Sequence, residues 1–357
     1  MFERRISVVV SIILACGLTM SAESAGAPSG GGDGRLYIHM IDVQHGLSIL
    51  IIGPDGTTVL YDAGGAGHRS DRIAPYLRKM GVDRAVGTTI ISHWHPDHYG
   101  GLARIKEAGI GFGNLYGNGG VPDRLARQLR GSIFGRMSPG WMMDLGWGAR
   151  ITCVAAGGNV IGRGSGRACR SGNSSSIALL IQYGGFDCLL TGDLEGGTDK
   201  SIRHISLQPD METPLVKAIM PGGAFPLLDE SGVEVLQVGH HGIETSTNST
   251  LMNLLSPSLA CISAGPFLMG NPHRSVVENV LLARSPCIRV PPALVLQTEE
   301  GSSLGPKSSQ AGFCVGDIVV SSDGVTGYRV EASGDIRQGP DERDLIPLPA
   351  EIGLDEP

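Results

Sequence analysis

The feature that most constrains this chain is the segment 92–101, SHWHPDHYGG. Within six residues it carries four side chains of the kind that bind metal ions, namely His93, His95, Asp97 and His98. The run directly before it, residues 86–91, is rich in β-branched side chains and predicts a buried strand, which Pro96 prevents from continuing. We therefore expect the histidines on a loop at the end of a strand, where folds commonly mount catalytic groups.

The four side chains in this segment predict a metal site. Imidazole nitrogen and carboxylate oxygen suit zinc and its neighbours in the first transition row. His93 and His95 are two residues apart and can hold one ion, whereas Asp97 and His98 are adjacent, point differently and can hold a second. A polar surface loop is the alternative interpretation, which so dense a set of ligand-type side chains disfavours.

The segment 92–101 resembles the signature of the metallo-β-lactamase superfamily of hydrolases. This resemblance implies a four-layer αββα sandwich, an α/β (α+β) fold with a one- or two-metal site at one edge. Residues 41–50, IDVQHGLSIL, are similar to a strand pair of the ComEC-like branch, which contains ComEC-type DNA-uptake proteins and secreted phosphocholine esterases. The match is partial, because Gln44 and His45 stand where that branch has Gly-Gln. In all, the resemblance covers residues 35–332.

Further site residues follow from the same resemblance. The Thr-Gly-Asp that ends at Asp193 implies a carboxylate bridging both metals, with a simple turn aspartate as the alternative. The Gly-His-His-Gly at 239–242 implies His240 as the final ligand of the second metal, with His241 as the other candidate ligand or a proton donor. Asp62, in an early Asp-x-Gly element, is expected to orient the ligands through hydrogen bonds beneath the metals. A strand-ending turn residue is the alternative for Asp62.

The chain departs from the superfamily pattern at one ligand. Most dinuclear members have a third histidine before the bridging aspartate, but no histidine occurs from residue 99 to residue 192. Asn173 stands there instead, in a stretch similar to the Asn-x-Ser of the ComEC-like branch, and is expected to be a weak ligand. An amide oxygen suits manganese better than zinc. The predicted cofactor is therefore two divalent ions, zinc or alternatively manganese.

The expected metal ligands predict an enzyme that hydrolyses its substrate without a covalent protein intermediate. Two ions about 3.5–4 Å apart lower the pKa of a water or hydroxide held between them and clamp the oxygens of the attacked group. The residues expected to take part in catalysis are Asp97, His241 and His273. For His273, which follows Asn271-Pro272, contact with substrate is expected, or alternatively the start of a helix over residues 275–283.

The branch resemblance implies a phosphodiester substrate: a small phosphodiester, a lipid headgroup or a nucleic acid. The net charge of −7 disfavours tight binding to nucleic acid, because such binding depends on neutralising phosphates. Local positive charge comes from Arg163, Arg167 and Arg170, which can seat a phosphate or form a solvated loop. The alternatives are a β-lactam or lactone hydrolase on the same fold, and a non-catalytic metal-binding module.

The N-terminus has the pattern of a secretory signal. Arg4 and Arg5 precede an apolar run at 6–14, and small residues follow at 21–27. We expect a signal peptide over 1–24, a flexible linker over 25–34, the hydrolase domain over 35–337 and a loose tail over 338–357. The predicted location is periplasmic or secreted, with no transmembrane segment after cleavage; lipid attachment at Cys16 is the alternative. An exported chain can pair some of its cysteines.

Glycine accounts for 54 of the 357 residues, which favours many short strands joined by tight loops. The glycine-rich stretch 109–120 is expected to be irregular and to wall the substrate cleft. Helices are expected over residues 71–80 and 102–108.

Overall fold

The computed structural model describes residues 32–163, 172–197, 208–266, 270–273, 275–281, 292, 294–299, 301, 313–332, 337–338 and 350–353. The expected signal peptide, residues 25–31 of the linker, Cys16, Arg167 and Arg170 lie outside the described residues. Within the described ranges, no helix is both long enough and apolar enough to cross a bilayer.

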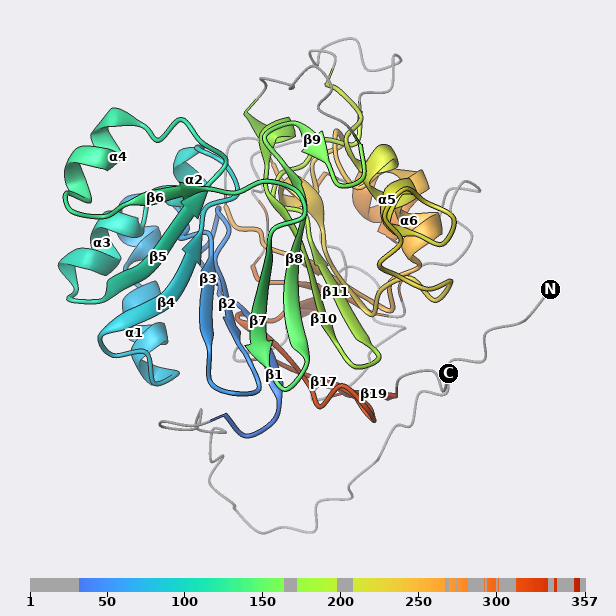
Figure 1. The fold of residues 1–357 in the computed structure, drawn as a ribbon, viewed down its shortest axis with the longest axis horizontal. Coiled ribbons are helices and arrows are strands. Elements are labelled where there is room, and N and C mark those ends of the chain that lie inside the picture. Colours follow the sequence, from blue (N-terminus) through green and yellow to red (C-terminus); the bar gives the residue numbers. More distant parts are fainter. Residues whose placement is uncertain are drawn as a thin grey trace.

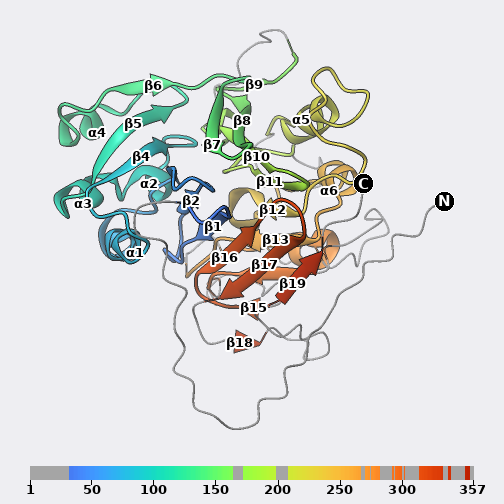
Figure 2. The ribbon, with the colours of Figure 1, turned by 60° about the horizontal axis from the view of Figure 1, so that its bottom comes forward.

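Two mixed β-sheets lie against each other at the centre of the molecule (Figure 1). The first has nine strands in the order β19-β17-β16-β1-β2-β3-β4-β5-β6. In chain order these are β1 (Leu36–Met40), β2 (Ile49–Ile52), β3 (Thr58–Tyr61), β4 (Ala85–Ile90), β5 (Gly111–Gly117), β6 (Phe134–Arg136), β16 (Ile318–Ser322), β17 (Gly327–Ala332) and β19 (Ala350–Gly353). Strands from the two ends of the sequence therefore share one sheet, with β16 and β17 lying beyond β1 (Figure 2).

The second sheet follows the order β18-β15-β14-β13-β12-β11-β10-β8-β7, and β9 pairs with β8. Its strands are β7 (Met142–Gly146), β8 (Ala149–Ala156), β9 (Asn159–Val160), β10 (Ala178–Tyr183), β11 (Phe186–Leu190), β12 (Val235–Gln237), β13 (Leu259–Ile262), β14 (Leu294–Gln297), β15 (Phe313–Cys314) and β18 (Arg337–Gln338). The strands β11 to β15 run parallel to one another. Their carboxyl ends therefore meet at one edge of the sheet.

Helices cover the outer face of each sheet (Figure 1). On the first sheet lie α1 (Ile73–Lys79), α2 (Pro96–Tyr99), α3 (Leu102–Glu107) and α4 (Asp123–Gln128), and on the second lie α5 (Glu212–Ile219) and α6 (Ser249–Leu255). One apolar cluster joins α1, α3 and α4 to the first sheet, and another joins α5 and α6 to the second. The layers follow the order αββα, as the resemblance implies.

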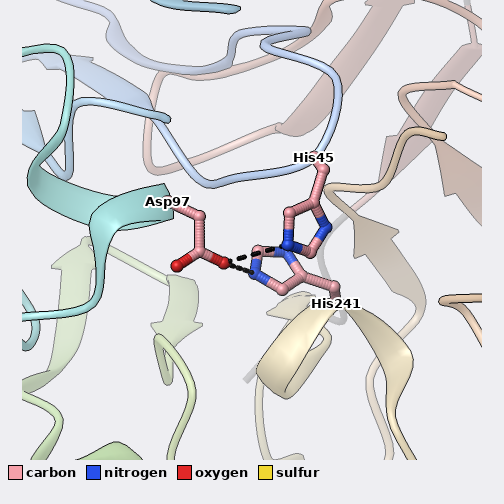
Figure 3. A group of neighbouring side chains, drawn as sticks. All are labelled: His45, Asp97 and His241. Carbon is pink, nitrogen blue, oxygen red and sulfur yellow. Dashed lines mark ion pairs between the residues drawn. The ribbon is translucent and has the colours of Figure 1, made fainter. Parts of the chain in front are cut away.

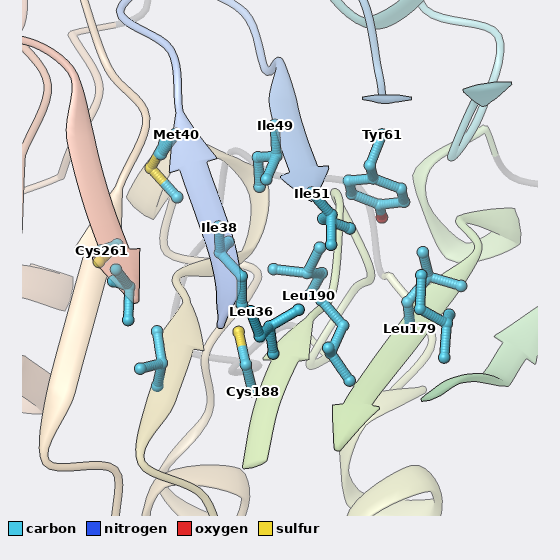
Figure 4. Packing of buried hydrophobic residues seen from close by; sticks show 14 of the residues in the cluster. Leu36, Ile38, Met40, Ile49, Ile51, Tyr61, Leu179, Cys188, Leu190 and Cys261 are labelled. Atoms are coloured by element: carbon cyan, nitrogen blue, oxygen red, sulfur yellow. The ribbon is translucent and has the colours of Figure 1, made fainter. Parts of the chain in front are cut away.

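The main core fills the space between the sheets (Figure 4). In β1, the side chains of Leu36, Ile38 and Met40 enter this core, which is the period-two pattern of a strand. They pack with residues of the second sheet such as Leu190. At one edge of this core the Tyr61 hydroxyl donates a hydrogen bond of 2.6 Å to the carbonyl of Ile177, which ties the two sheets together.

The stretch 109–120 is not irregular as expected, because it contains β5, which pairs in parallel with β4. Glycine is required here for close approach. A Cβ at Gly113 would lie 2.5 Å from the carbonyl oxygen of Gly87, and one at Gly117 would lie 2.4 Å from the Trp94 ring. The strand therefore uses glycines to pack closely against its neighbours.

Two further elements differ from expectation. The expected helix over 275–283 is a π-helix at Val276–Leu281. The expected loose tail contributes β19, which pairs with β17 because that strand offers an open backbone edge. Among the cysteines that the structure describes, Cys153, Cys188 and Cys261 are buried thiols outside any disulfide.

Candidate metal centre

The metal-binding segment stands where the first sheet meets its helices. Strand β4 ends at Ile90, the turn that follows carries His93 and His95, and α2 then begins at Pro96. Proline fits the first position of a helix, where no backbone donor is needed. The segment is therefore only partly a loop, because Asp97 and His98 lie on the first turn of α2.

Three imidazoles surround one oxygen of Asp97. The distances to its Oδ2 are 3.2 Å from His45 Nε2, 3.4 Å from His241 Nε2 and 3.9 Å from His98 Nε2. Figure 3 shows His45 and His241 approaching this carboxylate from two different segments of the chain. We call these four residues the Asp97 cluster.

A second set of imidazoles surrounds Asp193, which follows β11. Its Oδ2 lies 3.1 Å from His98 Nε2, 3.6 Å from His240 Nε2 and 3.8 Å from His93 Nε2. We call these four residues the Asp193 cluster. The two clusters share His98, and the other oxygen of Asp193, Oδ1, lies 3.9 Å from His241 Nε2. The structure thus places two candidate ion positions side by side.

Hydrogen bonds on the far side of the rings fix their orientation. His98 Nδ1 lies 2.7 Å from Asp62 Oδ2, and Asp62 also accepts hydrogen bonds from the backbone and hydroxyl of Ser92. His241 Nδ1 lies 3.0 Å from the carbonyl of Ser263. In both rings Nε2 is left facing the clusters, which is how metal-binding histidines are commonly held.

Several buried atoms in the clusters have no hydrogen-bond partner among the described residues. They are Nε2 of His93, Nε2 of His241 and Oδ1 of Asp193. Buried polar atoms are rarely left in this state, and an ion is one of the partners that satisfies them. Nitrogen and carboxylate donors suit zinc and manganese. The residues present therefore fit divalent ions. Two groups have ligand atoms that all lie within 4.8 Å of one another: one of His45, Asp97 and His241, and one of His93, His98 and Asp193.

Charge in the clusters favours metal binding. Burial opposes ionisation of Asp97, but His98, His241 and His45 together hold the pKa of its carboxyl well below the usual range. The pKa of Asp193 is likewise held low by His98, His240 and His241 despite complete burial. Burial lowers the pKa of His93 and of His45, whereas Asp193 and neighbouring carboxylates raise the pKa of His98 and of His240 despite burial. Ionised carboxylates and neutral imidazoles are the forms that bind metals, so His98 and His240 would release a proton as an ion binds.

Asn173 lies beside the Asp193 cluster. Its amide donates a 2.9 Å hydrogen bond to Glu195 Oε1, which lies 3.5 Å from His240 Nδ1. The amide nitrogen is also 3.3 Å from the His240 ring nitrogens. Glu195 was not singled out from the sequence, although it follows Asp193 by only two residues. It holds Asn173 and His240 together.

Two residues that the sequence places in the site, His95 and His273, lie at its edge. His95 is exposed, with its ring 4.5 Å from that of His93 and its Nε2 against Gly172. His273 is buried, its backbone N–H donates to the carbonyl of Gly242, and its Nδ1 lies 3.7 Å from Glu244. Arg163 is exposed.

A pocket of about 460 Å³ opens onto the Asp97 cluster, and its lining includes His45, Arg69, Asp97, His241 and Asn271. Neither Arg69 nor His45 was singled out as a site residue from the sequence. Position 45 did carry a signal, since the chain has a histidine where the ComEC-like branch has Gln.

A comparison with known proteins matches the part of the chain that carries several residues of the two clusters. The family model for the metallo-beta-lactamase superfamily matches residues 41–110, which contain His45, Asp62 and the whole metal-binding segment. This match supports the resemblance to the superfamily. The curated relatives of the chain place it in the ComEC-like branch, so the resemblance stated from the sequence is confirmed.

Recombination protein 2 of Haemophilus influenzae is 28% identical over 250 residues, covering 68% of this chain and 26% of that protein. ComE operon protein 3 of Bacillus subtilis is 32% identical over 109 residues, which is 30% of this chain and 11% of that one. Competence protein ComA of Neisseria gonorrhoeae is 26% identical over 229 residues, covering 63% of this chain and 26% of that protein. The chain thus spans at most about a quarter of the length of these relatives.

Among solved structures, a metal-dependent hydrolase of the β-lactamase superfamily matches with a TM-score of 0.36 and 16% identity, covering 64% of this chain and 88% of that one. The diiron β-hydroxylase CmlA of Streptomyces venezuelae matches with a TM-score of 0.38 and 16% identity, covering 66% and 45% of the two chains. The match to the superfamily model and the two-sheet sandwich support the fold of a metal-dependent hydrolase.

Proposed function

We propose that this chain is a metal-dependent phosphodiesterase with two divalent ions, one held by the Asp97 cluster and one by the Asp193 cluster. The observation that carries the proposal is that the two clusters share His98 and meet at Asp193, beside an open pocket. When bound, such a pair of ions lowers the pKa of an attacking water and stabilises the charge that develops on phosphoryl oxygens.

We assign the final ligand of the Asp97 cluster to His241 rather than His240. His241 Nε2 lies 3.4 Å from Asp97, and its other ring nitrogen is held by the Ser263 carbonyl. His240 faces Asp193 and Glu195 instead. This reverses the order that the sequence resemblance implied for the two histidines, and it leaves His241 as a ligand rather than a proton donor.

The pocket suits a small phosphodiester or the end of a single strand. Its volume of about 460 Å³ lies in the range of small-molecule sites. Arg69 lines it and can pair with a phosphate oxygen, since guanidinium matches phosphate geometry. Asn271 also lines the pocket, so we assign substrate contact to Asn271 and a supporting role to His273. Relatives named for recombination and competence make a nucleic-acid phosphodiester the first natural substrate class to test.

The test is hydrolysis of bis(p-nitrophenyl) phosphate and of a single-stranded oligonucleotide by the purified chain with Zn²⁺, and then with Mn²⁺. Asp97→Ala is the control. Turnover of either substrate that disappears in the variant supports the proposal. Two bound ions without turnover of either substrate would refute it, and turnover of a β-lactam or lactone would then favour that alternative. Ions bound without turnover of any of these would favour a metal-binding module.

We also propose that the chain is exported, on the basis of its N-terminal pattern. Arg4 and Arg5, the apolar run at 6–14 and the small residues at 21–27 form a cleavable signal. N-terminal sequencing of protein expressed in a Gram-negative host should find a periplasmic form that begins at Ala25. Uncleaved protein confined to the cytoplasm would contradict this.

A further inference from the structure

We infer that His45 is a direct ligand of the ion in the Asp97 cluster and binds it through Nε2. The inference rests on the proposed two-ion centre and adds to it a ligand from outside the metal-binding segment. His45 lies on the loop between β1 and β2, more than forty residues before the metal-binding segment. It stands at a position that the sequence analysis noted only as a mismatch.

The distances match ligands of one ion better than hydrogen bonds. Donor atoms around a tetrahedral zinc at 2.0–2.2 Å lie about 3.3–3.6 Å from one another. His45 Nε2 and His241 Nε2 lie 3.2 and 3.4 Å from the same Asp97 oxygen. A hydrogen bond between a charged imidazole and a carboxylate is typically about 2.7–2.9 Å long. The two rings also lie close, with their centroids 4.9 Å apart, so both nitrogens face one small space (Figure 3).

The loop that carries His45 is held against the ligands. The backbone N–H of Leu47 donates to the carbonyl of Asp97 over 3.1 Å. The hydroxyl of Ser263 donates to the carbonyl of Gly46 over 2.7 Å, while the carbonyl of Ser263 lies 3.0 Å from His241 Nδ1. One serine therefore fixes the loop that bears His45 and the ring of His241 together.

Two glycines make this close approach possible. Gly46 has φ +140°, and a Cβ there would lie 2.7 Å from the carbonyl oxygen of Asp97. A Cβ at Gly265 would lie 2.6 Å from the backbone nitrogen of His45. Since both contacts are with backbone atoms, a larger residue would displace the loop. Only 5% of the surface of His45 is exposed. The position of His45 is thus fixed by contacts among three segments: its own loop, the turn at Asp97, and residues 263–265.

The inference has a consequence for the two ions. His98 has one ring nitrogen facing the clusters, and it lies nearer Asp193 than Asp97, so His45 raises the protein ligands at the Asp97 position from two to three, namely His45, Asp97 and His241. Three protein ligands with one open position are the arrangement of a catalytic site. We therefore expect loss of His45 to weaken the ion of the Asp97 cluster and to leave the ion of the Asp193 cluster in place.

The test compares His45→Gln with His68→Gln, both with Zn²⁺ and with Co²⁺ in place of the natural metal. Glutamine keeps a hydrogen bond to Asp97 within reach but removes the imidazole ligand, and His68 is an exposed histidine that serves as the matched control. The readouts are metal per chain after dialysis, affinity from competition with a chelator, and the number of exchangeable, hyperfine-shifted imidazole N–H resonances in the cobalt protein. Each bound histidine contributes one such resonance.

We expect His45→Gln to lose the ion of the Asp97 cluster, or to bind it more than about 100-fold more weakly, which exceeds the usual loss on removing an outer hydrogen-bond partner. It should also lose one N–H resonance. His68→Gln should match the unmodified chain in every readout. Restoration of the ion in His45→Ala by added imidazole would support direct ligation further.

A His45→Gln protein that retains both ions, the affinity and the full set of resonances would overturn the inference while leaving the two-ion centre intact. If the unmodified chain binds no ion, the proposed function itself fails. Circular dichroism of the metal-free proteins identifies a variant that does not fold, and His45→Asn then takes its place.

Discussion

His240 and His241 are neighbours in the sequence but face different carboxylates. Both have positive φ, 49° and 54°, in the turn after β12, so the backbone directs their rings apart. His241 reaches Asp97, whereas His240 reaches Asp193 and Glu195. Their identical chemistry makes them a matched pair for separating the two ion positions.

We expect His241→Ala to remove the ion of the Asp97 cluster, because it deletes a ligand whose other nitrogen is already held by Ser263. His240→Ala should leave that ion in place and loosen the ion of the Asp193 cluster. Metal content and chelator competition measure both effects. The opposite pattern would restore the assignment of His240 that the sequence resemblance implied.

His39 gives a prediction on pH that is independent of the metal centre. Its side chain leaves β1 on the face toward α1, where Nδ1 lies 3.0 Å from the Tyr76 hydroxyl. Burial, assisted by the nearby charge of Lys79, lowers the pKa of His39 from 6.5 to about 4. Between pH 6.5 and pH 4 the unfolded chain binds a proton at this residue and the folded chain does not. The contribution of His39 to stability is therefore complete above pH 6.5 and is lost as the pH falls to 4.

We expect the free energy of unfolding of His39→Gln to fall less steeply as the pH is lowered through that window, by about 1.4 kcal/mol per pH unit. Chemical denaturation of the metal-free chain and the variant at pH 7 and pH 5 would measure the difference. Because other histidines titrate in both proteins, only the difference between them reports on His39. Equal slopes in the two proteins would show that His39 titrates normally.

The loop between β1 and β2 is the element on which the Asp97 cluster depends. A Cβ at Gly265 would lie 2.4–2.6 Å from backbone atoms of Gln44 and His45. We expect Gly265→Ala to displace this loop, lower the free energy of unfolding by about 1–3 kcal/mol and weaken metal binding, although the residue touches no metal. Gly111→Ala is the matched control, since its Cβ would meet nothing closer than 3.6 Å.

Denaturation midpoints and metal affinity, measured on both glycine variants, test this prediction. A Gly265→Ala protein with the metal affinity of the unmodified chain would show that the loop adjusts without moving His45. A loss of affinity in Gly111→Ala as well would show that the effect is general and does not depend on the loop.

Most strands were predictable from the sequence because their side chains alternate or form short apolar runs. The run at residues 86–91, for example, corresponds closely to β4. Strand β5 was not predictable, since its glycines carry no pattern and their use becomes visible only next to β4. Strand β19 depends on pairing with the distant β17, which no local pattern encodes.

In the candidate site, the sequence singled out the residues that stand in compact motifs. Five of the six expected ligands, all but His95, lie within the Asp97 and Asp193 clusters, although their roles as ligands stay predictions. Arg69 could not be singled out, because it reaches the site through packing between separate segments, and His45 was marked only by its mismatch with the ComEC-like branch. Glu195 lies next to a motif but acts on His240, which is 45 residues away. Contacts of this kind exist only in the folded chain.

Considering the protein as one unit, the proposed ions would connect the two sheets. Asp97 and His98 follow a strand of the first sheet, whereas Asp193 and His241 follow strands of the second. Beneath them, the Tyr61 hydroxyl donates a hydrogen bond to the carbonyl of Ile177. Bound metal would therefore stabilise the stacking of the sheets as well as the site itself.

Removing metal with a chelator should lower the thermal midpoint. A ligand present at 100 times its Kd stabilises the folded state by about 2.7 kcal/mol. For a chain of this size we expect a shift of roughly 3–5 °C, measurable by scanning calorimetry. Asp193→Asn, which removes the carboxylate that lies between the two proposed ion positions, should show a smaller shift on chelation. An equal shift in this variant would show that the stabilising ions bind elsewhere.

The strand order has a consequence for how the protein is made. A ribosome produces β1 early, but its second neighbour, β16, emerges only near the end of synthesis. Until then β1 has an open edge, and its apolar side chains have no complete opposite sheet to cover them. Such an edge is a template for pairing between unfinished chains. We therefore expect the yield of folded protein to depend on how well the nascent chain is shielded by chaperones, more than on the stability of the finished molecule.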